Sequence, residues 1–259
     1  MSASVSGEPD TVRRCNYVLR LADTSLVLAQ RLGEWVGHAP ALEEELGLAN
    51  VALDLLGQAR LLFAYAGELE ARGRSEDDLA FSRDQGDFLN LALAEQPNGD
   101  FGATIVRQVL LDGFQLVLYE SLEHSRDARL AAIAAKSLKE TRYHFRYSGG
   151  WLIRLGDGTP ESHRRVQAAL DDLWRFTGEL FAADEIDAAM AAARIAPVLG
   201  DLHPGWVARI DEVLSEATLT RPADVAYRWH GKRGEHSEHL GYLLAEMQFL
   251  YRAYPGARW

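Results

Sequence analysis

The sequence of 259 residues carries 38 acidic and 27 basic side chains, which give a formal net charge of −11 and an isoelectric point near 5.2. A charge of this sign argues against nucleic acid or an anionic membrane as the main partner, because both would repel the protein. Hydrophobic residues make up 47% of the chain, and no run approaches the roughly 20 apolar residues that a membrane span needs. The single cysteine, Cys15, excludes an internal disulfide.

The first 14 residues, MSASVSGEPDTVRR, lack the apolar centre of a secretory signal. The rest of the chain contains no internal repeat, no low-complexity tract and no convincing linker. We therefore expect a cytoplasmic protein with a disordered tail over residues 1–14 and a single helical domain over residues 15–259.

Apolar residues recur at intervals of three, four and seven, and almost no segment alternates as a half-buried strand does. The sequence therefore predicts an all-α fold. The helix predicted over 127–155 would be roughly 40 Å long at 1.5 Å per residue, which is typical of a helical bundle. Turn residues predict a loop over 96–100 and a long break over 196–205. The predicted helices cover residues 17–37, 40–71, 77–94, 101–124, 127–155, 166–181 and 240–250.

Three of these helices carry polar or small residues on one face of an otherwise apolar surface. In VALDLLGQ, Asp54 lies between leucines, where its carboxylate has little access to water and needs a partner. Because the stripes follow helical spacing, we expect them to meet at the centre of a bundle. The stripes consist of Gly47, Asn50, Asp54 and Gly57 in the second helix, Asp112 in the next long helix, and Ser137, Thr141, His144 and Ser148 in the one after it.

Two interpretations of these interior groups stay open. Asp54, Asp112 and His144 could ligate a metal, since one histidine and two carboxylates suffice to hold one. Alternatively, they belong to a buried network of hydrogen bonds and ion pairs. The arginines near them in the sequence, which could serve as partners in that network, are Arg60, Arg107 and Arg142.

The segment KETRYHFRYSGGW partly matches a di-iron helix. Ferritin-like di-iron proteins place Glu-x-x-His on two helices, because residues three apart share a face. Here Glu140 lies four residues before His144, and Thr141 occupies the position three before it. When His144 faces inward, Glu140 turns partly off that face, and we expect it to pair with Lys136 or Arg142. No histidine in the sequence has a glutamate three residues before it.

A second histidine cluster lies in WHGKRGEHSEHLG, residues 229–241. Its two closely spaced histidines and two glutamates could form a metal site. Alternatively, the glutamates mark a helix N-terminus, where they interact favourably with the helix dipole. The loop before them is basic and suits the carboxylates of a partner or phosphate groups. The cluster comprises Glu235, His236, Glu238 and His239, and the basic loop comprises His230, Lys232 and Arg233.

Several long segments, in order along the chain, resemble the structural, non-catalytic C subunits of bacterial phenylacetyl-CoA epoxidases. The resemblance covers residues 16–259. The segments that carry it are YVLRLADTSLVLAQRLGEWVGHAP, LDLLGQAR, EQPNGDFGATIVRQ, KETRYHFRYSGGWLIRLGDGT, LWRFTGELF and HSEHLGYLLAEMQFL.

The resemblance implies a long ferritin-like four-helix bundle with additional helices. It also implies membership of a soluble monooxygenase complex in phenylacetate catabolism. Such a complex uses O2 and NADPH to epoxidise the aromatic ring of phenylacetyl-CoA, which prepares the ring for degradation. In such a complex the catalytic A subunit is a paralogue that carries the di-iron centre. A small B subunit and a reductase with FAD and an iron–sulfur cluster complete the system, and this chain would hold no cofactor and have no activity alone.

Compared with the catalytic sibling, the six metal-ligand positions of this chain hold residues that we interpret as vestigial. We therefore expect a scaffold that pairs with the catalytic subunit. The alternative is an independent ferritin-like metal-dependent oxygenase that uses a reduced ligand set including Glu140. A further hypothesis is that the basic loop, through Lys232 and Arg233, contacts the CoA moiety. The six positions are Ser25, Asp54, Gly57, Asp112, Thr141 and His144.

Overall fold

The computed structural model describes residues 9–226 and 229–257. Within these ranges the chain forms helices and turns, and the only extended pairing is an isolated bridge between His230 and Glu235. The all-α prediction is confirmed, and the long helices are consistent with a ferritin-like fold. The chain divides into two compact units, residues 1–97 with 230–259 and residues 98–229. The single domain predicted over 15–259 stays a prediction.

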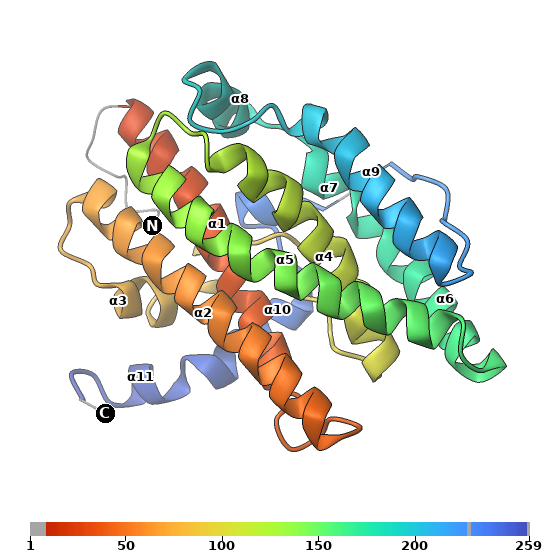
Figure 1. Ribbon diagram of the computed structural model, residues 1–259. Coiled ribbons are helices and arrows are strands. Elements are labelled where there is room, and N and C mark those ends of the chain that lie inside the picture. Colours follow the sequence, from red (N-terminus) through yellow and green to blue (C-terminus); the bar gives the residue numbers. More distant parts are fainter. Residues whose placement is uncertain (1–8, 227–228, 258–259) are drawn as a thin grey trace. The chain divides into compact units, whose positions relative to one another are not determined.

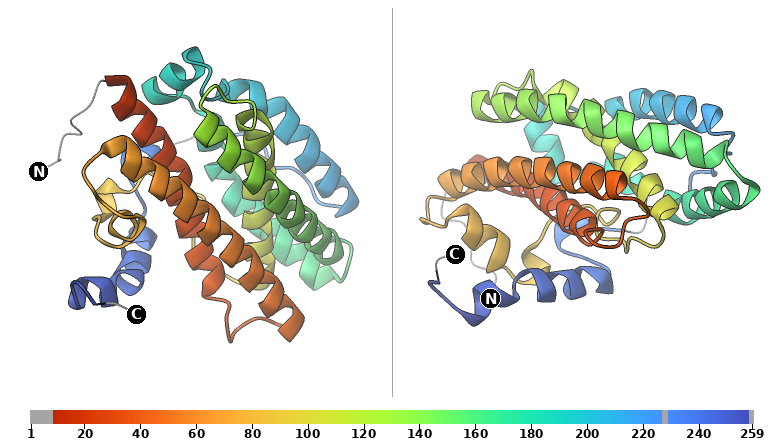
Figure 2. Two further views of the ribbon diagram at one scale, coloured as in Figure 1. Left: turned by 60° about the vertical axis from the view of Figure 1, so that its left-hand side comes forward. Right: turned by 60° about the horizontal axis from the view of Figure 1, so that its bottom comes forward.

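The first unit is built on a hairpin of two long helices, α1 and α2, which lie side by side in all views (Figures 1 and 2). The C-terminal segment returns to this unit, where α10 packs against α1. The elements are α1 (Pro9–Gly33), α2 (Leu42–Glu70), α3 (Glu76–Phe81), the 3-10 turns η1 (Gln85–Asp87) and η3 (Gly231–Arg233), α10 (Glu238–Met247) and α11 (Phe249–Ala253).

The start of α1 differs from the expectation of a tail over residues 1–14. The helix already begins at Pro9, with Asp10 in its first turn, where a carboxylate favours the helix dipole. Cys15, Tyr17 and Val18 are buried, so the first turns of α1 are held by packing. The remainder of the predicted tail, residues 1–8, lies outside the described residues.

The helix predicted over residues 77–94 is wrong beyond Phe81. After η1 the chain runs in turns, because tertiary contacts supply partners for its backbone. The Leu89 N–H donates to Oδ2 of Asp23 at 2.8 Å, and the Leu91 N–H donates to Oγ1 of Thr24 at 3.2 Å. With these groups bonded to side chains of α1, the segment needs no helix to satisfy them.

The second unit is built on the hairpin of α4 and α5, which pack along their lengths (Figure 1). Asp100 and Asp127 cap the N-termini of these two helices by accepting from backbone N–H groups. Helices α6 and α9 pack on α4. The elements are α4 (Phe101–Leu122), α5 (Ala128–Gly156), α6 (Pro160–Leu173), the 3-10 turn η2 (Trp174–Phe176), α7 (Gly178–Phe181), α8 (Glu185–Ala192) and α9 (Leu199–Glu216).

Two predictions for the second unit need correction. The single helix predicted over 166–181 is interrupted by η2, where Trp174 joins an aromatic cluster with Trp206 of α9. The long break predicted over 196–205 is right only up to residue 198, because α9 begins at Leu199 and continues through Pro204. The buried indole of Trp206 donates from Nε1 to the Leu110 carbonyl at 3.1 Å, which anchors α9 to α4.

By length and composition, α2 and α4 would each pass for a membrane span, which corrects the expectation drawn from the sequence. In α4, 89% of the most apolar stretch is buried within the protein, and in α2 the corresponding share is 50%. A buried apolar helix of this kind is typical of a protein core, so these two helices are weak support for a membrane location.

Candidate functional site

The predicted polar stripes of the second unit are present and buried. On α5, Ser137, Thr141, His144 and Ser148 are at most 1% exposed, and on α4, Gln108, Asp112 and Gln115 are at most 3% exposed. Each set follows the spacing of one helix face. We call these seven residues the α4–α5 polar seam.

Asp112 is the one carboxylate of the α4–α5 polar seam. Its Oδ2 accepts a hydrogen bond from Oγ of Ser148 at 2.7 Å, which joins the two helices. Burial raises the pKa of Asp112 from 3.8 to about 6, although His144, the Ser148 bond and Arg107 each act in the opposite direction. The carboxyl group is therefore partly protonated near neutral pH.

Within the described residues, five members of the α4–α5 polar seam carry buried atoms without a hydrogen-bond partner from the protein. Leaving one such group unsatisfied costs about 1–3 kcal/mol. Six groups would cost about 6–18 kcal/mol, which is as large as the net stability of a typical protein at about 5–15 kcal/mol. The six atoms are Nε2 and Oε1 of Gln108, Oδ1 of Asp112, Oε1 of Gln115, Oγ of Ser137 and Oγ1 of Thr141.

The ligand positions expected on α1 and α2 belong to the first unit. Ser25 is fully buried, whereas Asp54 and Gly57 are only half-buried. The expectation that the Asp54 carboxylate is shielded from water is therefore wrong. Its neighbour Leu53 is 64% exposed, whereas Leu55 is fully buried, so Asp54 lies at the edge of the exposed face of α2.

These residues do not fit the di-iron centre that the fold family implies. The position three before His144 holds the hydroxyl of Thr141 instead of a carboxylate. Glu140 forms an ion pair with Lys136 at 3.5 Å, as expected, and does not take the place of the carboxylate that is missing at position 141. No group of three or more His, Cys, Asp and Glu side chains within the described residues is arranged to hold a metal ion. The interpretation of the six positions as vestigial stays a prediction.

A buried charged network in the first unit was not predicted from the sequence. Asp23 on α1 forms a bidentate ion pair with Arg83, and both side chains are almost completely buried. The Arg83 guanidinium lies over the Phe88 ring at 4.3 Å and donates to the Asp87 carbonyl at 2.9 Å. This pair fixes the irregular segment after α3 against α1.

A second buried pair joins the same segment to the C-terminal part of the chain. Nδ1 of His236 lies 2.9 Å from Oε2 of Glu95, and Nε2 lies 2.8 Å from the Phe88 carbonyl oxygen. A carboxylate and a carbonyl oxygen both accept hydrogen bonds, so this pair of neighbours favours the doubly protonated imidazolium form of the ring. Burial alone would lower the pKa of His236, but the bond to Glu95, its charge and the Phe88 carbonyl outweigh that effect and raise it.

Glu95 accepts further hydrogen bonds next to this pair. Its Oε1 accepts from the Ser237 N–H at 2.7 Å, and its Oε2 also accepts from Nδ2 of Asn90 at 3.0 Å. The guanidinium of Arg31 donates to the Glu95 backbone carbonyl at 2.8 Å and to the His239 carbonyl at 3.2 Å. His236 therefore serves as an internal cross-link, and a metal-ligand role for it has no support in this geometry.

The other residues of the histidine cluster at 229–241 lie just before α10 or in its first turn. Glu238 lies in the first turn of α10, as the helix-start interpretation predicts. His230 immediately precedes the turn η3, and Gly234 follows it with a φ of 82°, where an added Cβ would lie 2.5 Å from the Gly86 carbonyl oxygen. The contact of His230, Lys232 and Arg233 with a partner or CoA stays a prediction.

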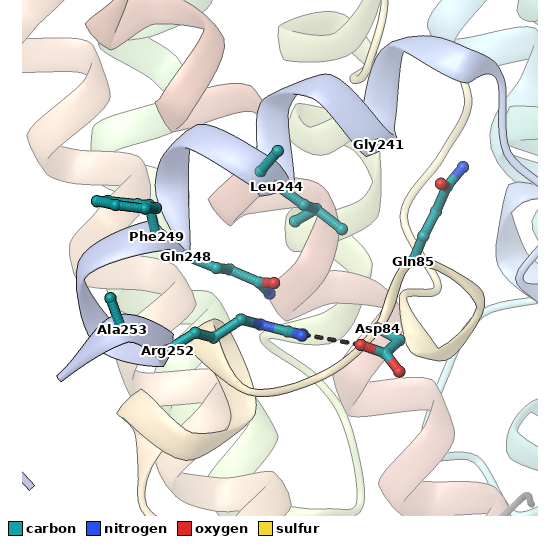
Figure 3. Close-up of a pocket in the computed structure, with 9 residues that line it drawn as sticks. Asp84, Gln85, Gly241, Leu244, Gln248, Phe249, Arg252 and Ala253 are labelled. Carbon is teal, nitrogen blue, oxygen red and sulfur yellow. Dashed lines mark hydrogen bonds and ion pairs between the residues drawn. The ribbon is translucent and has the colours of Figure 1, made fainter. Parts of the chain in front are cut away.

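A surface groove of about 500 Å³ lies between the C-terminal helices and the η1 loop of the first unit (Figure 3). Its polar side chains are bonded within the protein. Arg252 donates to Oδ1 of Asp84 at 2.9 Å, and Gln248 donates to the carbonyls of Ala80 and Arg83 at 3.2 and 3.0 Å. These bonds fasten α10 and α11 to the rest of the unit.

Asp23, Arg83 and Glu95 were not predicted because polar stripes on the longest helices are the dominant signal in the sequence. One signal for Asp23 was available, since it interrupts the apolar run of RLADTSLVL. No local signal pairs Glu95 with His236, because 141 residues separate them. Cys15 is also internal, and burial raises the pKa of its thiol to about 11, which makes it unreactive at neutral pH.

Known protein families and characterised proteins include clear relatives of this chain. The family described as phenylacetic acid catabolic protein matches residues 3–259. The C subunit of the 1,2-phenylacetyl-CoA epoxidase of Escherichia coli (strain K12) is 55% identical over 243 residues, which cover 94% of this chain and 98% of that protein. The resemblance inferred from the sequence is confirmed, and the chain belongs to the phenylacetic acid catabolic protein family.

Proposed function

We propose that this chain is the structural, non-catalytic subunit of a phenylacetyl-CoA epoxidase complex in phenylacetate catabolism. The observation that carries the proposal is the donor set of the interior: Thr141 stands where a ligand glutamate is needed, and Asp112 is bonded to Ser148. A chain with these groups supplies no di-iron centre of its own. The same donor set counts against an independent oxygenase.

In this proposal the chemistry belongs to the partners. A paralogous di-iron subunit binds the acyl-CoA ester, a reductase delivers electrons from NADPH through FAD and an iron–sulfur cluster, and a further small protein completes the complex. The likeness to the C subunit of the E. coli enzyme supports this assignment. All of these components would work together in the cytoplasm.

The outer face of α2 supports pairing with another subunit. Leu42, Leu46 and Leu53 are 68%, 57% and 64% exposed, and their spacing of four and seven places them on one side of the helix. Large apolar side chains gathered on one face mark a protein interface more often than scattered ones do. We propose that this leucine face packs against a helix of the di-iron subunit.

The proposal is tested by expressing the chain alone and together with its di-iron partner in iron-supplemented medium. We expect iron only in the co-purified complex, and ring epoxidation of phenylacetyl-CoA only when both chains are present. About two irons per chain in the protein expressed alone, the complement of a di-iron site, would overturn the proposal.

The leucine face is tested with the double variant Leu46→Glu/Leu53→Glu. We expect this variant to fold but to lose co-purification with the di-iron subunit, because charges would be buried unpaired at the contact. Leu250→Glu is the matched control, since Leu250 is 52% exposed on α11 of the same unit. Normal association of the double variant would show that the contact lies elsewhere.

A further inference from the structure

We propose that the α4–α5 polar seam binds a file of ordered water molecules, which form part of the folded structure. The inference rests on buried polar atoms that find no partner among the described residues of the protein. It does not depend on the proposed function, because it concerns only the hydrogen bonding of side chains on α4 and α5.

The unpartnered atoms are distributed along the α4–α5 polar seam instead of at one point. From Ser137 to Ser148 the seam extends about 16 Å along α5, at 1.5 Å per residue. The bond between Ser148 and Asp112 sets the register of the antiparallel hairpin. In that register, Gln115 lies level with the turn of α5 that carries Thr141 and His144. Unpartnered atoms spread over this length need several small ligands in a row, because no single small ligand reaches all of them.

The mixture of donors and acceptors selects the chemical class of ligand. Gln108 leaves one amide donor and one acceptor unpaired in either orientation of its side chain, Asp112 leaves an acceptor, and the Thr141 hydroxyl can do both. A cation would satisfy only the acceptors, and an apolar molecule would satisfy none. Water donates and accepts, and buried waters typically make two to four bonds to such groups.

The first test is the sign of the stability change in Thr141→Val, which removes one hydroxyl and keeps the side-chain shape. When water binds there, the variant loses hydrogen bonds and its unfolding midpoint falls. When the seam is dry, the variant removes an unsatisfied group and its midpoint rises. A raised midpoint would therefore overturn the proposal.

Thr104→Val is the matched control for this measurement. Thr104 is fully buried on α4, and its hydroxyl donates to the Asn98 carbonyl at 2.9 Å. Loss of this hydrogen bond lowers the unfolding midpoint whether or not the seam binds water, and the size of the change calibrates the effect of one lost hydrogen bond. Ser137→Ala, which also removes an unpartnered hydroxyl, provides the same sign test if Thr141→Val does not fold.

The second test counts long-lived internal waters by oxygen-17 relaxation dispersion on the full chain. Proteins hold roughly one buried water per 27 residues, so a chain of this size has about ten, and the comparison of variants is decisive. We expect Thr141→Val to lose the signal of at least one water and Thr104→Val to lose none. An unchanged signal in Thr141→Val would contradict the inference.

Discussion

Replacement of Glu95 by alanine tests whether the buried pair with His236 holds the C-terminal segment in the first unit. In the folded chain Glu95 and His236 have fully buried side chains, and the carboxylate accepts from three donors. The Glu95→Ala variant leaves the imidazolium, the Ser237 N–H and the Asn90 amide without that acceptor. All three would then be buried without their shared partner.

The expected loss follows from the burial of the pair. Breaking a buried ion pair by removing one partner costs about 3–5 kcal/mol, because the remaining imidazole must either stay charged without a partner or give up its proton. For a protein of this size, 3–5 kcal/mol lowers the unfolding midpoint by about 6–20 °C. Glu34→Ala is the control: its carboxylate pairs with Arg31 at 2.7 Å but is 38% exposed, and such pairs contribute about 0–1 kcal/mol.

The pH dependence gives a second, independent readout. The raised pKa of His236 means that the folded protein holds this proton more tightly than the unfolded chain does. The stabilisation is therefore fully present below the ordinary pKa of 6.5 and is lost as the pH rises through the raised value in the folded state. The difference in stability between wild type and His236→Gln should shrink over that range.

The assay is urea unfolding followed by circular dichroism at pH values from about 5 to 9, which bracket the ordinary histidine pKa. The reasoning would be refuted if Glu95→Ala lost no more stability than Glu34→Ala. A difference between wild type and His236→Gln that stayed constant with pH would instead refute the imidazolium assignment.

Three further changes have expected outcomes that thermal or urea unfolding can check. Asp112→Asn should gain up to about 3 kcal/mol at pH 7, because the raised pKa of Asp112, about 6, disfavours the charged form, and the gain should vanish below pH 4. Arg83→Leu should lose about 3–5 kcal/mol, since Asp23 stays buried and unpaired, and equal stability would contradict this. Gly156→Ala should lose about 1–3 kcal/mol, because the new Cβ would lie 2.2 Å from the Ala217 carbonyl oxygen, and an unchanged midpoint would disprove the close approach.

The long helices were predictable because several local signals agree. The predicted helices over 40–71, 101–124 and 127–155 differ from α2, α4 and α5 by no more than two residues at either end. Apolar periodicity runs through each of them, and aspartate caps mark the starts of α4 and α5. Local and tertiary preferences therefore select the same structure.

The errors occur where tertiary contacts override local preference. Residues 88–94 have helical periodicity, but the backbone N–H groups of Leu89 and Leu91 donate to Asp23 and Thr24 and so make no helical bonds. In α9, Pro204 removes one backbone donor near the start of the helix, and burial of Trp206 and Ile210 on one face outweighs that loss. Neither outcome is encoded within a short window of sequence.

The candidate site, like the fold, was only partly predictable from the sequence. Helical spacing alone identified Ser137, Thr141, His144 and Ser148 as one interior face, and the structure buries all four. The bond between Ser148 and Asp112 adds what spacing cannot give, namely the register of α5 on α4. The Asp54 carboxylate was misjudged because periodicity identifies faces of a helix but not which of them another element covers.

The polar interior of the second unit explains why a core without a di-iron ligand set keeps an ionisable group. Replacing Asp112 by alanine removes the acceptor of the Ser148 hydroxyl and leaves that hydroxyl only the Phe145 carbonyl at 3.5 Å, so we expect Asp112→Ala to destabilise the fold. Asp112→Asn keeps an acceptor for Ser148, removes the charge and replaces the other oxygen by an amide donor. If the alanine variant is less stable than wild type while the asparagine variant is more stable, the side chain is held by its hydrogen bond and not by its charge. If instead the asparagine variant is the less stable of the two, the charged carboxylate itself has a partner, and its charge is the reason that Asp112 is kept.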